Sequence, residues 1–143
     1  MKKLFTILSL FILFGCEQHH IDIAQLEGYW EISKAENEEG KSKVFQMNEN
    51  IDYIVLEDST GIRKKVKPQF SGKFQGSKDV EEFQLIEGKE GNLILKYQTP
   101  YDSWNEEIIE LTEEKLVVKN NNGITYTYQR YKGLMEFDDE KQN

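Results

Sequence analysis

The chain has 143 residues, of which 38% are hydrophobic and 31% are charged, and its net charge is −8. This length suits a single domain with a modest core. The acidic balance argues against nucleic-acid binding, because a basic face supplies most of the affinity for a phosphate backbone. The single cysteine excludes an internal disulfide.

The chain begins MKKLFTILSLFILFGC, with two lysines followed by an apolar run that ends at Phe14. This run is about half as long as the roughly 20 residues of a membrane-spanning helix, which favours a signal peptide over residues 1–15. Leu13-Phe14-Gly15-Cys16 resembles the lipobox of bacterial lipoproteins. The resemblance implies a lipid on Cys16 and a place in the cell envelope, anchored at the outer membrane. The alternative is an ordinary secretory signal with a chance cysteine.

Residues 16–22 are short and polar, and we expect them to tether the lipid to the folded domain. Asp22 is placed to N-cap a single turn over residues 23–26. His19 and His20 lie in the tether, and we interpret them as linker residues. No metal or cofactor site is predicted.

From Gly28 onward, apolar and polar residues alternate with period two, which is typical of strands. Turn signals separate the alternating runs, and Asn122-Gly123 is a strong hairpin signal. The predicted strands cover residues 28–34, 51–57, 62–68, 70–76, 81–87, 92–99, 104–111, 115–119 and 124–131. In an alternative interpretation, 62–68 and 70–76 form one strand bent at Pro68.

Segment 35–50 is the one long polar connection, of a size that often forms a lid or rim. Residues 134–143 are acidic, and we expect a frayed tail there. Many short strands joined by tight turns indicate an antiparallel sandwich or an up-and-down barrel over residues 23–133.

Strand parity places Trp30 and Arg130 on the inward faces of the first and last strands. In the last strand, ITYTYQRY, Arg130 shares the apolar face with Tyr126 and Tyr128. An inward charge is costly without a partner, and an aromatic ring is a good partner for arginine. First and last strands are neighbours only in a closed sheet, so we expect Arg130 to pack over Trp30. The alternative is a sandwich in which Arg130 faces solvent.

The arrangement of Gly28, Trp30 and Arg130 resembles the lipocalin and wider calycin group. In that group a G-x-W motif opens the first strand, and an arginine at the end of the barrel packs over the tryptophan. The resemblance is greatest to small lipocalin-like lipoproteins of Bacteroidota-type bacteria. It implies an all-β, antiparallel up-and-down barrel of about eight strands over residues 23–133.

The candidate ligand site is the inward face of this predicted barrel. Its members are aromatic and share inward parity: Phe70, Phe74, Phe83, Tyr97, Tyr126 and Tyr128. They either line an apolar pocket or form a packed core, because an eight-stranded barrel is barely wide enough for one small ligand. The loop that carries Tyr101 and Trp104 is the candidate rim or partner contact.

The lipocalin resemblance implies a lipid-anchored envelope protein that binds a small hydrophobic molecule in its barrel. The alternative is an inhibitor-type or immunity-type lipoprotein with a filled barrel, which binds a protein partner through its acidic surface. We expect a monomer.

The domain contains no Ser–His–Asp or Cys–His set, so we do not expect an enzyme. The basic run at residues 63–67 is interpreted as the outer face of a strand, with a patch for anions or lipid headgroups as the alternative.

Overall fold

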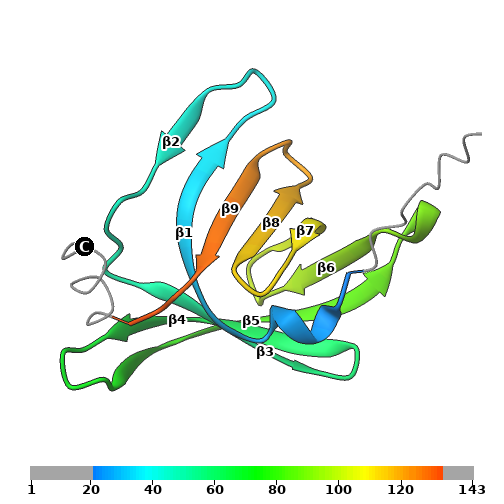
Figure 1. The fold of residues 1–143 in the computed structure, drawn as a ribbon. Helices are drawn as coiled ribbons and strands as arrows, with labels where there is room; N and C mark the ends of the chain where they lie inside the picture. Colours follow the sequence, from blue (N-terminus) through cyan, green and yellow to red (C-terminus); the bar gives the residue numbers. More distant parts are fainter. Residues whose placement is uncertain (1–20, 134–143) are drawn as a thin grey trace, which may run out of the picture.

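A computed structural model describes residues 21–133, whose strands form one antiparallel sheet that closes into a barrel (Figure 1). The sheet closes because β1 pairs with β9 as well as with β3. Eight strands follow one another around the barrel in chain order, and β2 is added at the edge of β1. The predicted up-and-down barrel of about eight strands is therefore confirmed.

The strands are β1 (Gly28–Glu36), β2 (Ser42–Val44), β3 (Ile51–Glu57), β4 (Thr60–Pro68), β5 (Phe74–Glu87), β6 (Leu93–Gln98), β7 (Ser103–Leu111), β8 (Lys115–Asn120) and β9 (Thr125–Arg130). Two short 3₁₀ helices, η1 (Ile23–Leu26) and η2 (Lys89–Gly91), accompany them. The predicted signal peptide 1–15, the lipid site Cys16, most of its tether and the tail 134–143 lie outside the described residues.

The structure corrects the sequence prediction between Pro68 and Glu87. The chain turns back after Pro68, where Gln69 N–H donates to the Lys73 carbonyl and Gly72, at φ +77°, completes the turn. β5 then runs without interruption to Glu87. The bend at Pro68 and the separate strand over 70–76 are both wrong, because Ser71-Gly72 supplies the turn.

Segment 35–50 is also more ordered than the sequence predicts, because β2 lies within it. β1 pairs with β3 only over Gly28–Trp30, and it pairs with β2 over Lys34–Glu36. Between these two ladders, Asn48 donates from its amide to Ile32 O at 2.9 Å and to Glu31 Oε1 at 3.2 Å. We call this part of the barrel wall the β1–β3 seam.

One end of the barrel is closed by the Arg130 guanidinium, whose Cζ lies 3.8 Å from the centroid of the Trp30 ring. Its nitrogens donate to the carbonyls of Gln25, Glu27 and Glu113 over 2.6 to 2.8 Å. The predicted packing of Arg130 over Trp30 is confirmed. Gln25 belongs to η1, Glu27 directly precedes β1, and Glu113 lies in the β7–β8 turn. One side chain of the last strand therefore joins these three segments.

Helix η1 completes this closed end. The Asp22 carboxylate accepts from Ala24 N–H at 3.2 Å, which confirms the predicted N-cap. Leu26 is fully buried, and its carbonyl accepts from Trp30 Nε1 at 2.8 Å. The helix therefore fixes the tryptophan ring on which Arg130 rests.

The apolar core lies inside the barrel and includes Leu26 and Trp30 of the closed end. Its buried members are Leu26, Trp30, Ile54, Phe83, Leu95, Tyr97, Ile108, Leu111, Leu116, Val118 and Tyr128. No helix within residues 21–133 has the length and apolar character needed to cross a bilayer.

Gly28 allows the close approach of Arg130. Its φ is +120°, and a Cβ at this position would lie 2.6 Å from Arg130 Nη1. Gly28→Ala should therefore lower the free energy of unfolding through backbone strain of about 1–2 kcal/mol and through a steric clash of about 1–3 kcal/mol. Urea unfolding of the two proteins measures the loss.

Gly40→Ala is the matched control, because Gly40 has φ +82° but no atom within 4 Å of a built Cβ. It should show the backbone strain alone. In an Arg130→Ala background, the extra loss at Gly28 should disappear. Equal losses at the two glycines would contradict the close approach.

Candidate binding site at the open end of the barrel

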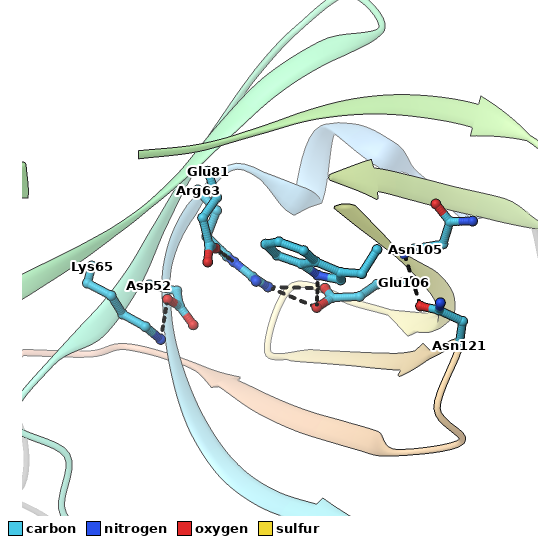
Figure 2. A network of polar contacts seen from close by, with 8 residues as sticks. Asp52, Arg63, Lys65, Glu81, Asn105, Glu106 and Asn121 are labelled. Atoms are coloured by element: carbon cyan, nitrogen blue, oxygen red, sulfur yellow. Dashed lines mark hydrogen bonds and ion pairs between the residues drawn. The ribbon is translucent and has the colours of Figure 1, made fainter. Parts of the chain in front are cut away.

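A network of charged side chains is centred on Arg63 inside the barrel (Figure 2). Arg63 of β4 donates from Nε to Glu81 at 2.6 Å, and from Nη1 to both carboxylate oxygens of Glu106 at 3.1 and 3.3 Å. Trp104 Nε1 also donates to Glu106, at 3.2 Å. The guanidinium stacks on the Tyr97 ring, 4.4 Å from its centroid. Arg63 therefore combines paired carboxylates with an aromatic face.

A second buried carboxylate, Asp52, lies beside this network on β3. Lys65 Nζ is 2.6 Å from Asp52 Oδ1, but the two atoms lack hydrogen-bond geometry, so the contact is an ion pair only. The Tyr97 hydroxyl is also buried without a hydrogen bond to any of the described residues. Both polar groups border the small cavity that remains inside the barrel.

That interior cavity has a volume of about 10 Å³, which is room for about one water molecule. Its walls include Asp52, Arg63, Tyr97, Glu106 and Tyr128. Pockets for small organic ligands usually have volumes of about 300–1,000 Å³. The barrel is therefore filled by its own side chains and does not enclose a deep apolar cavity.

A larger pocket, of about 300 Å³, opens at the mouth of the barrel directly above this network. It is lined by Arg63, Asp102, Trp104, Glu106, Asn120, Asn121, Asn122, Tyr126 and Tyr128. The β8–β9 turn is held over it because Asn121 Oδ1 accepts from Asn105 N–H at 3.2 Å (Figure 2). We call this hollow the mouth pocket. It offers aromatic faces, amides and one arginine–carboxylate pair to a ligand.

Burial and charge fix the protonation of these groups. Burial lowers the pKa of Arg63, but the electrostatic effects of Tyr97, Glu106, Tyr128 and Glu81 raise it by more, so this pKa lies well above its usual range. Burial raises the pKa of the Tyr97 and Tyr128 phenols, and Arg63 offsets only part of this increase. The site therefore presents a permanent cation beside neutral phenols.

The six aromatic residues predicted for the interior fall into two groups. Phe83, Tyr97 and Tyr128 are buried in the core, and the half-buried Tyr126 lines the mouth pocket. Phe70 and Phe74 are wrongly predicted, because they lie outside the barrel with exposed fractions of 87% and 38%. The sequence parity fails at Phe70 because residues 69–72 form a turn. It fails at Phe74 because this first residue of β5 packs on Tyr29 outside the barrel.

The two predicted rim residues lie in different environments. Tyr101 lies in the β6–β7 turn and is 97% exposed. Trp104 instead stacks on Tyr97, with ring centroids 4.9 Å apart, and forms a wall of the mouth pocket. Trp104 is thus part of the site, whereas Tyr101 only marks the loop beside it.

The sequence interpretation missed the charged residues of the site, although strand parity contained the signal. Asp52 alternates with the inward Ile54 of β3, and Glu106 alternates with the inward Ile108 of β7. Because side chains two positions apart share a face of a strand, each carboxylate points to the same inner face as the apolar residue that follows it. Parity alone does not show that Arg63 from another strand meets them.

A hollow of about 640 Å³ lies elsewhere, on the surface of β3–β6. Long solvated side chains such as Glu82, Gln84 and Lys96 line it, so it presents few fixed polar groups to a ligand. Within residues 21–133, no group of three or more His, Cys, Asp or Glu side chains is placed to hold a metal ion.

The chain matches the family model of the lipocalin-like domain over residues 26–118, which is more than half its length. It belongs to this family. No curated protein matches the chain.

Several solved structures are similar in fold. A lipocalin-like protein from Bacteroides uniformis is 9% identical, with a TM-score of 0.47, and the match covers 75% of this chain and 99% of that one. An uncharacterized protein from Bacteroides eggerthii is 13% identical, with a TM-score of 0.45 and coverage of 73% and 98%. Lobster apocrustacyanin A1 is 12% identical, with a TM-score of 0.46 and coverage of 83% and 68%.

Arg63→Met should destabilise the fold by about 3–5 kcal/mol, because it leaves the buried Glu106 carboxylate without its cation. The double variant Arg63→Met/Glu106→Leu should lose less stability than the sum of the two single variants, since neither charge is then left alone. Urea unfolding of the four proteins measures the coupling.

The exposed pair Lys115–Glu110 on the outer surface is the control for this cycle. The same kind of replacement there should change the free energy of unfolding by about 0–1 kcal/mol. Additive losses at Arg63 and Glu106 would contradict a coupled buried pair.

The tyrosines predict how stability depends on pH. Folding raises the pKa of Tyr97 and Tyr128 above the value of about 10 found in unfolded chains, so the folded state favours their neutral form. Their contribution is fully present below about pH 10 and is lost as the pH rises towards the folded-state pKa. Unfolding free energies measured across this range should fall, and fall less in Tyr97→Phe.

Phenolate absorbance provides the independent reading. Tyr97 and Tyr128 should ionise only when the barrel unfolds. Ionisation of either phenol near pH 10 with the fold intact would contradict this prediction.

Proposed function

We propose that the protein is a lipid-anchored binding protein of the bacterial cell envelope, which holds a small amphiphilic molecule in the mouth pocket. The observation that carries the proposal is the contrast between an interior of about 10 Å³ and a mouth pocket of about 300 Å³. Membership of the lipocalin-like family supports a binding role. We assign binding and not catalysis, since the chain offers no nucleophile–histidine pair within the barrel.

The chemistry of the pocket defines the ligand class. Trp104, Tyr126 and Tyr128 offer faces on which an apolar ring or short chain packs, while Arg63 and Glu106 accept a polar group at the floor. The filled interior leaves no space for a long acyl chain. The sequence-based expectation of a hydrophobic ligand is thereby narrowed to a small molecule with a polar end.

The location in the cell rests on the N-terminal sequence. The apolar run before Cys16 and the likeness of residues 13–16 to a lipobox support lipid attachment at Cys16 and a place at the outer membrane. A lipid anchor would hold the barrel at the membrane surface, where small amphiphilic molecules concentrate.

A second function is favoured by the same filled interior. A barrel without a deep cavity can serve as a rigid body that binds a protein partner through its acidic surface. The net charge of −8 suits a basic partner. The mass of the purified protein distinguishes the two functions.

The test is native mass spectrometry of residues 17–143, produced through the periplasm and never denatured. These residues contain all the elements of the closed barrel. We expect an additional mass that is released on unfolding, and its identity names the ligand class. A clean protein mass would overturn ligand binding in favour of the protein partner.

Two variants test whether the ligand binds in the mouth pocket. Trp104→Leu and Tyr126→Leu remove aromatic walls and should abolish the additional mass, provided that thermal unfolding shows both variants folded. Tyr101→Leu is the matched control, because Tyr101 is exposed nearby but does not line the pocket. Retention of the mass in all three variants would exclude the mouth pocket as the binding site.

A further inference from the structure

The β4–β5 hairpin extends beyond the barrel wall and ends in an exposed tip (Figure 1). The ladder between the two strands is interrupted after Lys64 and resumes at Val66, and it continues to the pair Pro68–Phe74. Residues 69–76 are all exposed. We call residues 66–76 the hairpin tip. It lies against the outer face of the barrel, where Phe74 contacts Tyr29 and Tyr131, the chain neighbours of Trp30 and Arg130.

Charge is distributed very unevenly between this hairpin and the rest of the chain. Residues 60–78 contain six basic side chains and no acidic one: Arg63, Lys64, Lys65, Lys67, Lys73 and Lys78. The other 12 of the 18 basic side chains share the remaining chain with all 26 acidic ones. The hairpin is therefore strongly basic on a protein whose net charge is −8.

Only two of these six cations form ion pairs with buried carboxylates. Arg63 pairs with Glu81 and Glu106, and Lys65 pairs with Asp52. Lys67 makes one surface ion pair, with Glu49, which contributes little to stability. Lys64, Lys73 and Lys78 have no ion pair with any residue in the range 21–133. The outward cations are thus available to a partner.

The tip also presents a large apolar side chain. Phe70 is 87% exposed at the turn. The tip is held in place because Phe74 stacks on Tyr29 with ring centroids 4.3 Å apart, and Tyr29 stacks on Tyr53 at 4.5 Å. Tyr131 contacts Phe74 edge-on at 6.2 Å. This outer aromatic stack fixes the hairpin while Phe70 remains free.

We propose that the hairpin tip docks on an anionic lipid surface, with Phe70 inserted among the headgroups and the outward lysines above them. An aromatic side chain flanked by lysines is the combination that interfacial membrane contacts use. Phe70 favours a lipid surface over a nucleic acid, because its exposed ring gains free energy on entering an apolar layer, which a phosphate backbone does not provide. The docking needs no lipid on Cys16 and no ligand in the mouth pocket.

The test is co-sedimentation of residues 17–143 with vesicles of phosphatidylcholine, with and without phosphatidylglycerol. We expect binding only to the vesicles that contain phosphatidylglycerol, and a decrease as salt is added. Lys73→Gln/Lys78→Gln should weaken the partition coefficient by about five-fold for each lysine. Phe70→Ser should weaken it on the order of ten-fold, because the inserted ring is lost.

Matched controls separate the tip from general surface effects. Lys41→Gln/Lys43→Gln removes two exposed lysines from the β1–β2 hairpin, and Tyr101→Ser removes an exposed aromatic from another turn. Both should bind like the unaltered chain. Equal binding by the tip variants and the unaltered chain, or no binding to anionic vesicles, would overturn the proposal.

The same assay distinguishes two other binding partners of the hairpin tip. Vesicle binding that appears only when the chain ends at Gly133 would overturn the proposal in favour of the acidic segment 134–143 as the occupant of the tip. Gly133 itself lines a pocket together with Phe70 and Phe74. Binding to soluble polyglutamate but not to the vesicles would overturn it in favour of an acidic protein.

Discussion

The guanidinium of Arg130 lies over Trp30 and donates to three backbone carbonyls, and this contact holds the two ends of the sheet together. Arginine suits the role because its planar fork provides several donors and a face that stacks on an aromatic ring. Once β1 and β9 are joined, every strand between them has a fixed inner and outer face. The closed end, the core and the orientation of the polar interior all follow from that closure.

A second arginine determines the character of the other half. Arg63 brings carboxylates from β5 and β7 together inside the barrel and stacks on Tyr97, so side chains occupy the space in which a ligand would otherwise lie. Buried ion pairs contribute little net stability compared with apolar packing, but they favour one arrangement of the strands over others. The result is a filled barrel with a polar mouth.

Much of the fold could be predicted from the sequence, because alternation and closure constrain each other. Parity placed Trp30, Tyr128 and Arg130 on one face, and the structure agrees. It failed at Phe70, which lies in a turn and has no inner face, and at Phe74, where β5 begins outside the barrel wall against Tyr29. The charged site was not predicted. Alternation with Ile108 is compatible with an inward Glu106, but its contact with Arg63 depends on strand register, which no local pattern encodes.

The β1–β3 seam has a kinetic consequence. Its ladder contains only the pairs formed by Gly28, Tyr29 and Trp30, and Asn48 bridges the wall beyond them. Proteins open locally where few backbone hydrogen bonds must be broken. We therefore expect the wall to open locally at this seam more readily than between β3 and β4, whose ladder contains seven pairs.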